Sequence, residues 1–330
     1  MELHDLARDD VVATSDASKL GLGPSDLRRM LKQGDIHRLI RGWYAVRRPG
    51  SHRAPWEGED EWQTARALHR LLTFALLRSF DGRVVASHQS ALVLHDVRLW
   101  KTDLATAHLS RSSDDHTRLR TSAVLHPSCG TDPVQCPAGY ATAPVATAVV
   151  QVGLRPPRTG LPSFAFESLV AADGALHDGL TTDLELKAAV DAHAGHPGIQ
   201  GVRALLAHAD GRHESVGETR LAYTMRVLGY RFTPQVKVVA GGRAWRVDFE
   251  LDDDPVVAEF DGMTKYSGGL VHPTPQDLQQ ALAQEKWRED RLRETGREVT
   301  RFVWNEADNA HLVAARIDAA IARARRRLGA

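Results

Sequence analysis

Acidic residues gather in one short stretch near the carboxyl end of the chain. Seven of the fourteen residues from Asp248 to Asp261 are Asp or Glu, and so many like charges repel one another unless water or a cation offsets them. Asp248 and Glu259 differ from the rest because each lies within an apolar, strand-like run, where an unpaired charge is costly. Two carboxylates on neighbouring strands supply the oxygen ligands that Mg²⁺ prefers. The pattern therefore predicts that Asp248 and Glu259 bind Mg²⁺ or Mn²⁺.

The same carboxylates have a simpler alternative explanation, which is an ion pair with Arg246 or Lys286. A third acid, Glu218, is a further catalytic candidate, although Ser215 three residues before it also forms the pattern of a helix capping box. Both explanations of Glu218 stay open.

Two further features complete this candidate site. Lys265 follows Asp261 by four residues, where its ammonium group could orient a metal-bound water or hold a phosphate; a solvated loop lysine is the alternative. Asp252, Asp253 and Asp254 are expected to be solvent-exposed turn residues.

The periodicity of the last 120 residues predicts the elements that position these groups. Gly241 and Gly242 form a two-residue hairpin turn, and the order of elements is αβββαβα. The expected segments are a helix over 215–228, strands over 235–240, 243–251 and 256–261, a helix over 276–295, a strand over 298–304 and a helix over 310–328.

A second charged region lies near the amino terminus. Residues 19–53 hold nine basic and two acidic residues, a net charge of +7, which indicates a phosphate-binding surface. The pattern predicts a short helix over 15–20, a second helix from Pro24 to Gly34 and a hairpin over 36–46, an order typical of a winged helix. The candidate DNA-binding residues are Arg28, Arg29, Lys32 and Arg41.

Between these two regions we find no catalytic pattern. Residues 47–62 have the composition of a linker, and residues 127–162 are expected to consist mostly of loop. His88 and His95 lie seven residues apart in an apolar run, which favours packing and hydrogen bonding over metal binding.

Composition limits the remaining function classes. The 330 residues are 42% apolar and 25% charged, with 42 basic and 42 acidic residues, so no overall field attracts nucleic acid or membrane. The chain has no apolar run of about 18 residues and no basic leader, so we expect a cytoplasmic protein without a membrane partner. Its two cysteines are expected to be free thiols.

Residues 214–304 resemble the PD-(D/E)XK nuclease superfamily, in particular its very-short-patch-repair-like endonucleases. The motifs that carry the resemblance are ESVGETRL, RVDFEL, VVAEFDGMTKY, EKWREDRLRETG and RFVW. The resemblance implies Mg²⁺-dependent phosphodiester cleavage with Asp248 and Glu259 holding the metal. It also implies a lysine at position 261, where this chain has Asp261, so either Lys265 replaces it or the centre is impaired.

Residues 5–190 resemble AbiEi-type antitoxins of type IV toxin-antitoxin systems, through GLGPSDLRRMLKQGDIHRLIRGWYAV and SHQSALVLHDV. That resemblance implies repression of the protein's own promoter through a winged helix, and it makes a cognate toxin a candidate partner. The carboxyl-terminal part departs from these antitoxins, so antitoxin activity does not carry over.

Together these patterns predict an α+β protein with a winged helix over 1–48, an AbiEi-like α/β middle domain over 60–200 and a restriction-endonuclease-like domain over 212–330. The expected function is DNA binding with Mg²⁺-dependent endonuclease activity on double-stranded DNA, in defence or repair. The alternative is a non-catalytic transcriptional repressor or antitoxin-like protein with a degenerate nuclease fold.

Overall fold

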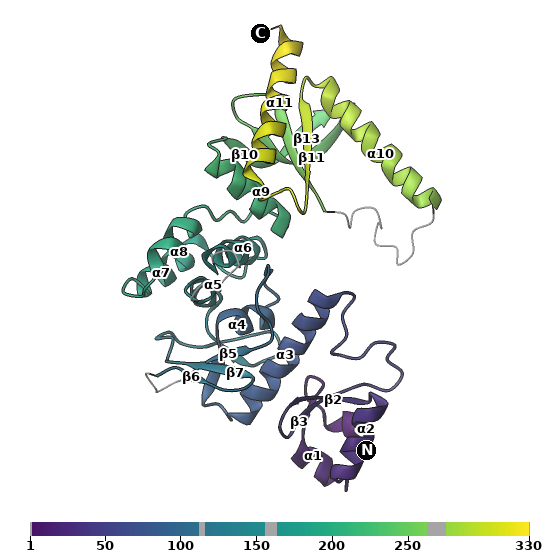
Figure 1. The fold of residues 1–330 in the computed structure, drawn as a ribbon, viewed down its shortest axis with the longest axis vertical. Helices are drawn as coiled ribbons and strands as arrows, with labels where there is room; N and C mark the ends of the chain where they lie inside the picture. The colour runs from purple at the N-terminus through teal and green to yellow at the C-terminus, as the bar shows by residue number, and fades with distance from the viewer. Residues whose placement is uncertain (1, 112–115, 156–163, 263–274, 330) are drawn as a thin grey trace. The chain divides into compact units, whose positions relative to one another are not determined.

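The computed structural model describes residues 2–111, 116–155, 164–262 and 275–329. The chain has a mixed α+β fold (Figure 1), as the sequence predicts. It divides into two compact units, Met1–Ala207 and His208–Ala330. We describe each unit by itself. None of the described helices combines the length and the apolar character needed to cross a membrane.

The first unit begins with a small helical and sheet head. After η1 (Leu3–Leu6), it contains β1 (Val11–Ala13), α1 (Thr14–Lys19), α2 (Pro24–Gln33), β2 (Ile36–Ile40) and β3 (Trp43–Val46). The three strands form a sheet in the order β1-β3-β2. Buried Val12, Leu27 and Ile36 belong to one apolar cluster beneath the helices, which fixes the packing of α2 against the sheet.

Local sequence explains the bounds of α2. Pro24 occupies the first turn, and the carboxylate of Asp26 accepts the N–H of Gly23 at 3.0 Å, which satisfies one exposed amide at the helix start. Gly34 ends the helix with a φ of 77°, a left-handed conformation that glycine adopts without steric cost. The predicted start and end of this helix are therefore confirmed.

Helix α3 (Glu61–Ser79) connects the head to the rest of the first unit. It contacts β1, β2 and β3, and it also contacts β4 (Val84–Ala86) and β5 (Ala107–Arg111). Near its end, the guanidinium of Arg78 donates hydrogen bonds to the carbonyls of Arg8, at 3.3 Å, and Val11, at 2.6 Å. Arg78 also lies over the ring of Trp43, 4.8 Å from its centroid.

A mixed six-stranded sheet organises the remainder of the first unit, in the order β6-β7-β5-β4-β9-β8. Its further strands are β6 (Arg118–Leu119), β7 (Ala123–His126), β8 (Val134–Gln135) and β9 (Ala141–Thr142). The helices are α4 (His88–Leu94), α5 (Val145–Gly153), α6 (Phe164–His177), α7 (Asp183–Ala192) and α8 (Ile199–Leu206). Helices α4, α5 and α6 pack in succession, and α7 and α8 pack against α5 and α6.

Two segments of this region have more structure than their composition indicates. Residues 127–162 were expected to consist mostly of loop, yet α5 lies within them, and every residue of α5 is buried. A helix that is buried on all sides has no polar face, so it shows no amphipathic period for the sequence to reveal. Residues 47–62 also have more order than a linker requires, because Ala54 is 2% exposed and Arg47 pairs with Glu57 at 3.1 Å.

The second unit contains α9 (Val216–Val227), β10 (Phe232–Ala240), β11 (Arg243–Leu251), β12 (Val256–Asp261), α10 (Pro275–Glu294), β13 (Glu298–Val303) and α11 (Ala310–Leu328). This is the same αβββαβα order that the periodicity predicts. Strand β10 begins at Phe232, three residues before its predicted start.

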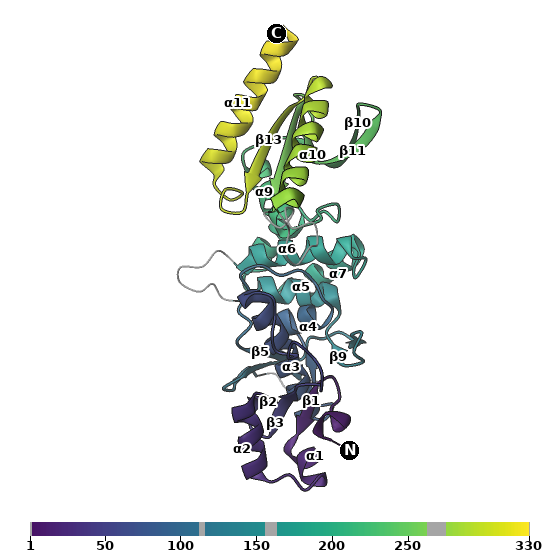
Figure 2. The same cartoon turned by 90° about the vertical axis from the view of Figure 1, so that its right-hand side faces the viewer.

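The sheet of the second unit has the order β10-β11-β12-β13. Its first three strands are antiparallel, and β13 runs parallel to β12. Buried side chains of α9 and α11, including Leu221 and Ile317, pack on one face of the sheet. Leu292 of α10 packs on the other face (Figure 2). The sheet is therefore covered by helices on both sides, and its central strands β11 and β12 are shielded from water.

Candidate nucleic-acid interface and tail carboxylates

Helix α2 presents basic side chains to solvent. Arg28, Arg29 and Lys32 are exposed, while Leu27 is buried against the sheet. Arg29 forms an ion pair with Asp26 at 2.8 Å, and Nε of Arg28 donates to the carbonyl of Pro24 at 3.2 Å. The pairing lowers the pKa of Asp26, together with the hydrogen bond from the Gly23 amide, which is the larger cause. The cationic face predicted for this helix is thus available to a ligand.

The hairpin after α2 adds another exposed cation. Arg41 lies in the turn between β2 and β3 and is exposed. The neighbouring aromatic residues have structural contacts instead: Tyr44 packs against the apolar cluster of the head, and Trp43 lies beneath Arg78. Packing therefore accounts for Trp43 and Tyr44.

Ion pairs separate the nine basic residues of segment 19–53 into two groups. Five of them pair with acids, namely Lys19, Arg29, Arg47, Arg48 and Arg53. Within the described ranges, the other four form no ion pair: Arg28, Lys32, Arg38 and Arg41. Arg38 belongs to this basic segment but is not among the four residues predicted from the sequence to bind DNA. Its exposed position on β2, between partly buried neighbours, is the alternation that could have identified it.

In the second unit, Glu218 acts as a cap. It is 7% exposed, its carboxylate accepts the N–H of Glu214 at 2.8 Å and the hydroxyl of Ser215 at 2.9 Å, and its own N–H donates to Ser215 Oγ. The side-chain amide of Gln235 donates to the same carboxylate at 2.8 Å. The capping role that the sequence left open is present, and these contacts fix the carboxylate at the start of α9.

Asp248 and Glu259 lie on the adjacent central strands β11 and β12. The paired register includes Phe249 with Ala258, and the two acids are the next residues beyond that pair. Oδ2 of Asp248 accepts the backbone N–H of Phe260 at 2.7 Å. The structure therefore brings the Asp248 carboxylate to the main chain directly beside Glu259.

Glu259 is buried, with 4% exposure, and is held by two arginines. Its Oε1 accepts from Arg288 of α10 at 2.6 Å and its Oε2 from Arg301 of β13 at 3.2 Å. The alternative explanation from the sequence is an ion pair with Arg246 or Lys286. For Glu259 these partners are wrong. Long-range packing of α10 and β13, which spacing along the chain does not reveal, supplies the cations.

The contacts of these carboxylates bear on the expected Mg²⁺. Their oxygens have suitable chemistry, but both oxygens of Glu259 already bond to guanidinium groups, and Oδ2 of Asp248 bonds to an amide. A hard divalent cation needs such oxygens as ligands, and it would have to displace Arg288 or Arg301. In this arrangement the donor set does not fit Mg²⁺, and we derive no catalytic step through a metal.

The remaining candidates of the tail have separate environments. Asp261 is the last residue of β12, opposite Val303 of β13, and Lys265 lies outside the described residues. Asp252 and Asp253 are exposed in the turn, as expected. Asp254 is different, because its side chain is only 9% exposed and pairs with Arg325 of α11 at 2.8 Å.

The structure also assembles a group that the sequence did not indicate. His88, His108 and His126 are 20 and 18 residues apart along the chain, yet potential ligand nitrogens of all three lie within 4.8 Å of one another. Burial lowers the pKa of His88 well below its usual value and that of His126 to about 4. Among the residues that the structure describes, these three form the group of His, Cys, Asp or Glu side chains close enough to share a metal ion. Among the described residues of the tail, no three carboxylates lie this close together.

Comparison with known proteins gives a family match for the amino-terminal head. Residues 1–47 match the family model described as "Transcriptional regulator, AbiEi antitoxin". Two uncharacterized proteins of Mycobacterium tuberculosis, MT2308 and Rv2248, are each 32% identical over 161 residues, which is 47% of this chain and 56% of theirs. The chain thus spans little more than half the length of these curated relatives.

A solved structure, the RV2827C protein from Mycobacterium tuberculosis, aligns with 65% of this chain and 81% of its own at 19% identity and a TM-score of 0.33. A likeness this low supports no conclusion. The family match therefore shows that the amino-terminal segment is similar to antitoxin-type transcriptional regulators.

Proposed function

We propose that this protein is a transcriptional regulator that binds double-stranded DNA through α2 and the β2–β3 hairpin. The observation that carries the proposal is the set of exposed cations without ion pairs, Arg28 and Lys32 on α2 and Arg41 at the hairpin turn. They belong to a helix-turn-helix with a hairpin wing, in which the second helix enters the major groove and the wing contacts the backbone. The family match of residues 1–47 supports the same assignment.

The roles of the cations follow from their positions. Exposed arginine and lysine side chains on α2 neutralise phosphates or donate to base edges, and Arg41 neutralises a phosphate beside the groove. The apolar side chain of Leu27 anchors α2 on the sheet, so the helix presents a rigid face. In an antitoxin-type regulator the DNA is the protein's own promoter, and a cognate toxin is the second proposed partner.

The experiment measures binding of the full chain to a labelled duplex from the region upstream of its own gene. Fluorescence anisotropy at physiological salt compares it with a scrambled duplex of the same length and composition. A specific regulator prefers its site by at least about 1,000-fold. Equal affinity for both duplexes, or no binding to either, would exclude a promoter-specific regulator.

A second candidate function is DNA cleavage by the second unit. It is favoured by the αβββαβα order and by the position of Asp248 and Glu259 on neighbouring central strands, which resemble a PD-(D/E)XK nuclease. Metal-dependent cleavage would require Arg288 or Arg301 to release Glu259. The test is incubation with supercoiled, linear and mismatched DNA at millimolar Mg²⁺ or Mn²⁺. Cleavage by the parent that Asp248→Asn abolishes, with DNA affinity unchanged, supports this candidate. No cleavage of any of the three substrates removes it and leaves a non-catalytic regulator.

A further inference from the structure

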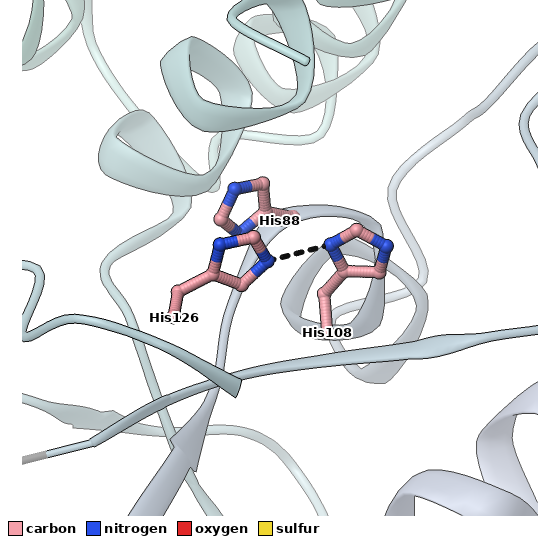
Figure 3. A group of neighbouring side chains, drawn as sticks. All are labelled: His88, His108 and His126. Atoms are coloured by element: carbon pink, nitrogen blue, oxygen red, sulfur yellow. Dashed lines mark hydrogen bonds between the residues drawn. The ribbon is translucent and has the colours of Figure 1, made fainter. Parts of the chain in front are cut away.

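We propose that His88, His108 and His126 form a zinc-binding site in the first unit, with a fourth coordination position open to water. Figure 3 shows the three imidazoles close together, with a dashed line between the rings of His108 and His126. They come from three separate segments: His88 begins α4, His108 lies on β5 and His126 ends β7. Potential ligand nitrogens of all three lie within 4.8 Å of one another. Neutral imidazole is a preferred zinc ligand, and three protein ligands leave one position free.

The backbone of His88 places its ring in this group. His88 has a φ of 50°, a left-handed conformation that costs free energy in an L-residue and occurs most often at functional positions. Its N–H donates to Oε1 of Gln151 at 3.1 Å, and Oγ of Ser87 lies 3.1 Å from Nδ1 of its ring. Such an outer hydrogen bond fixes the orientation and tautomer of a metal-binding histidine. These contacts hold His88 in the left-handed conformation and orient its ring.

The parallel strands position the other two rings. The register pairs His108 with Val124 and Ser110 with His126, so the two histidines are offset by two positions along adjacent strands. Residues offset by two share a face of the sheet, and Nδ1 of His108 lies 2.8 Å from Nε2 of His126. Both side chains are partly exposed, which leaves a route for an ion and for a water ligand.

The distances are close to those of a zinc site. Two nitrogens bound to one zinc at the usual bond lengths and a tetrahedral angle are about 3.3 Å apart. The pair at 2.8 Å must therefore open by about 0.5 Å, and the widest separation, 4.8 Å, must close by about 1.5 Å. The ring of His88 stacks on that of His126, with centroids 3.9 Å apart, so the three nitrogens reach one ion only after the imidazole rings rotate. A hard ion such as Mg²⁺ prefers oxygen ligands, so an all-nitrogen site discriminates against it.

Positive charge near the group comes from Arg155, whose charge helps to lower the pKa of both His88 and His126. This guanidinium is buried beside the carboxylate of Glu167, with Nη2 and Oε2 3.8 Å apart. Glu167 also accepts a hydrogen bond from Thr102 at 2.9 Å. The Glu167 carboxylate offsets the charge of Arg155, so a divalent ion at the three histidines does not face an isolated cation.

The test uses untagged full-length protein freed of metal with a chelator. Calorimetric titration with zinc chloride should give one tight site per chain, and cobalt should give the visible absorption of tetrahedral coordination. Loss of one ligand in His108→Gln or His126→Gln should weaken zinc binding by at least about 100-fold, since loss of merely an outer partner costs 10- to 100-fold. The matched control is His95→Gln, because His95 is a partly buried histidine that bonds to Thr142 at 2.9 Å outside this group.

Each result has a defined meaning. Tight binding in the parent and in His95→Gln, with loss in either ligand variant, supports the site. Absence of micromolar binding in the parent, or equal binding in both ligand variants and the parent, overturns it. If the ligand variants fail to fold, the parent protein decides. A zinc-dependent rise in melting temperature together with tetrahedral cobalt absorption supports the proposal. Absence of either effect overturns it. Asp248→Asn should bind zinc like the parent, which separates this site from the tail carboxylates.

Discussion

Three cations of the head, Arg28, Lys32 and Arg41, form no ion pair among the described residues. Their removal should weaken DNA binding and flatten its dependence on salt concentration. The variant carries Arg28→Ala, Lys32→Ala and Arg41→Ala. All three side chains are exposed, so truncation removes charge and leaves the apolar cluster around Leu27 intact. We therefore expect a folded protein with fewer phosphate contacts.

The size of the effect follows from counterion release. Each phosphate contact contributes about 0.9 to the slope of log affinity against log salt, so three contacts contribute about 2.7. Between 50 and 200 mM salt, a slope of that size corresponds to about a 40-fold change in affinity. Arg29→Ala alone should have a smaller effect than Arg28→Ala, because Asp26 already pairs with Arg29 at 2.8 Å.

The assay is fluorescence anisotropy on one duplex at a series of salt concentrations. The control variant removes three exposed basic side chains outside the head, with Arg83→Ala, Arg120→Ala and Lys187→Ala. It has the same net charge as the test variant. The control should keep the parent slope. Equal slopes in the parent and the test variant, or equal losses in the test and control variants, would refute the assignment of α2 and the hairpin.

Three predictions concern stability. Burial lowers the pKa of His69 from 6.5 to about 4. Between these pH values the unfolded state binds more protons than the folded state. About 3 kcal/mol of stability that is present above pH 6.5 should therefore be lost as the pH falls toward 4. Arg288→Met should lower stability by about 2 kcal/mol, because it removes one charged hydrogen bond from buried Glu259. Gly217→Ala should cost about 3 kcal/mol, because its Cβ would lie 2.0 Å from the ring of Phe260. Denaturant unfolding measures all three.

Matched variants test the cause of each effect. His69→Gln should flatten the loss of stability between pH 6.5 and 4, and an unchanged slope would contradict the role of His69. Arg326→Met, on an exposed arginine of α11, should change stability little; a loss equal to that of Arg288→Met would show that the ion pair is unimportant. Gly201→Ala in α8, where nothing lies within 4 Å of an added Cβ, should be neutral or stabilising.

Elements with local sequence signals could be predicted. Pro24 and Gly34 determine the bounds of α2, and Gly241 and Gly242 turn β10 into β11 with positive φ values of 57° and 75°. These features depend on residues close along the chain, so spacing reveals them. Helix α5 shows the limit, because its complete burial depends on the rest of the unit and removes the polar face that a sequence pattern needs.

The sites depend on residues distant in sequence. Glu259 contacts Arg288 and Arg301, which are 29 and 42 residues away, and no local pattern distinguishes these from the other arginines. The sequence favours packing and hydrogen bonding for both His88 and His95, whereas tertiary packing places His88 beside His108 and His126. The types of residue in the tail were predictable, but their partners follow from tertiary packing.

Arg78 has a mechanical consequence for the amino-terminal head. Its guanidinium bonds to the carbonyls of Arg8 and Val11 and lies over the ring of Trp43. These contacts hold the head directly against α3, so the linker-like segment does not act as a free hinge. If the head binds DNA as proposed, a force on it passes directly to the 19-residue helix α3. A fragment that ends within residues 47–60 lacks the contacts of Arg78, so a fragment made to test the proposed DNA binding should include α3 (Glu61–Ser79).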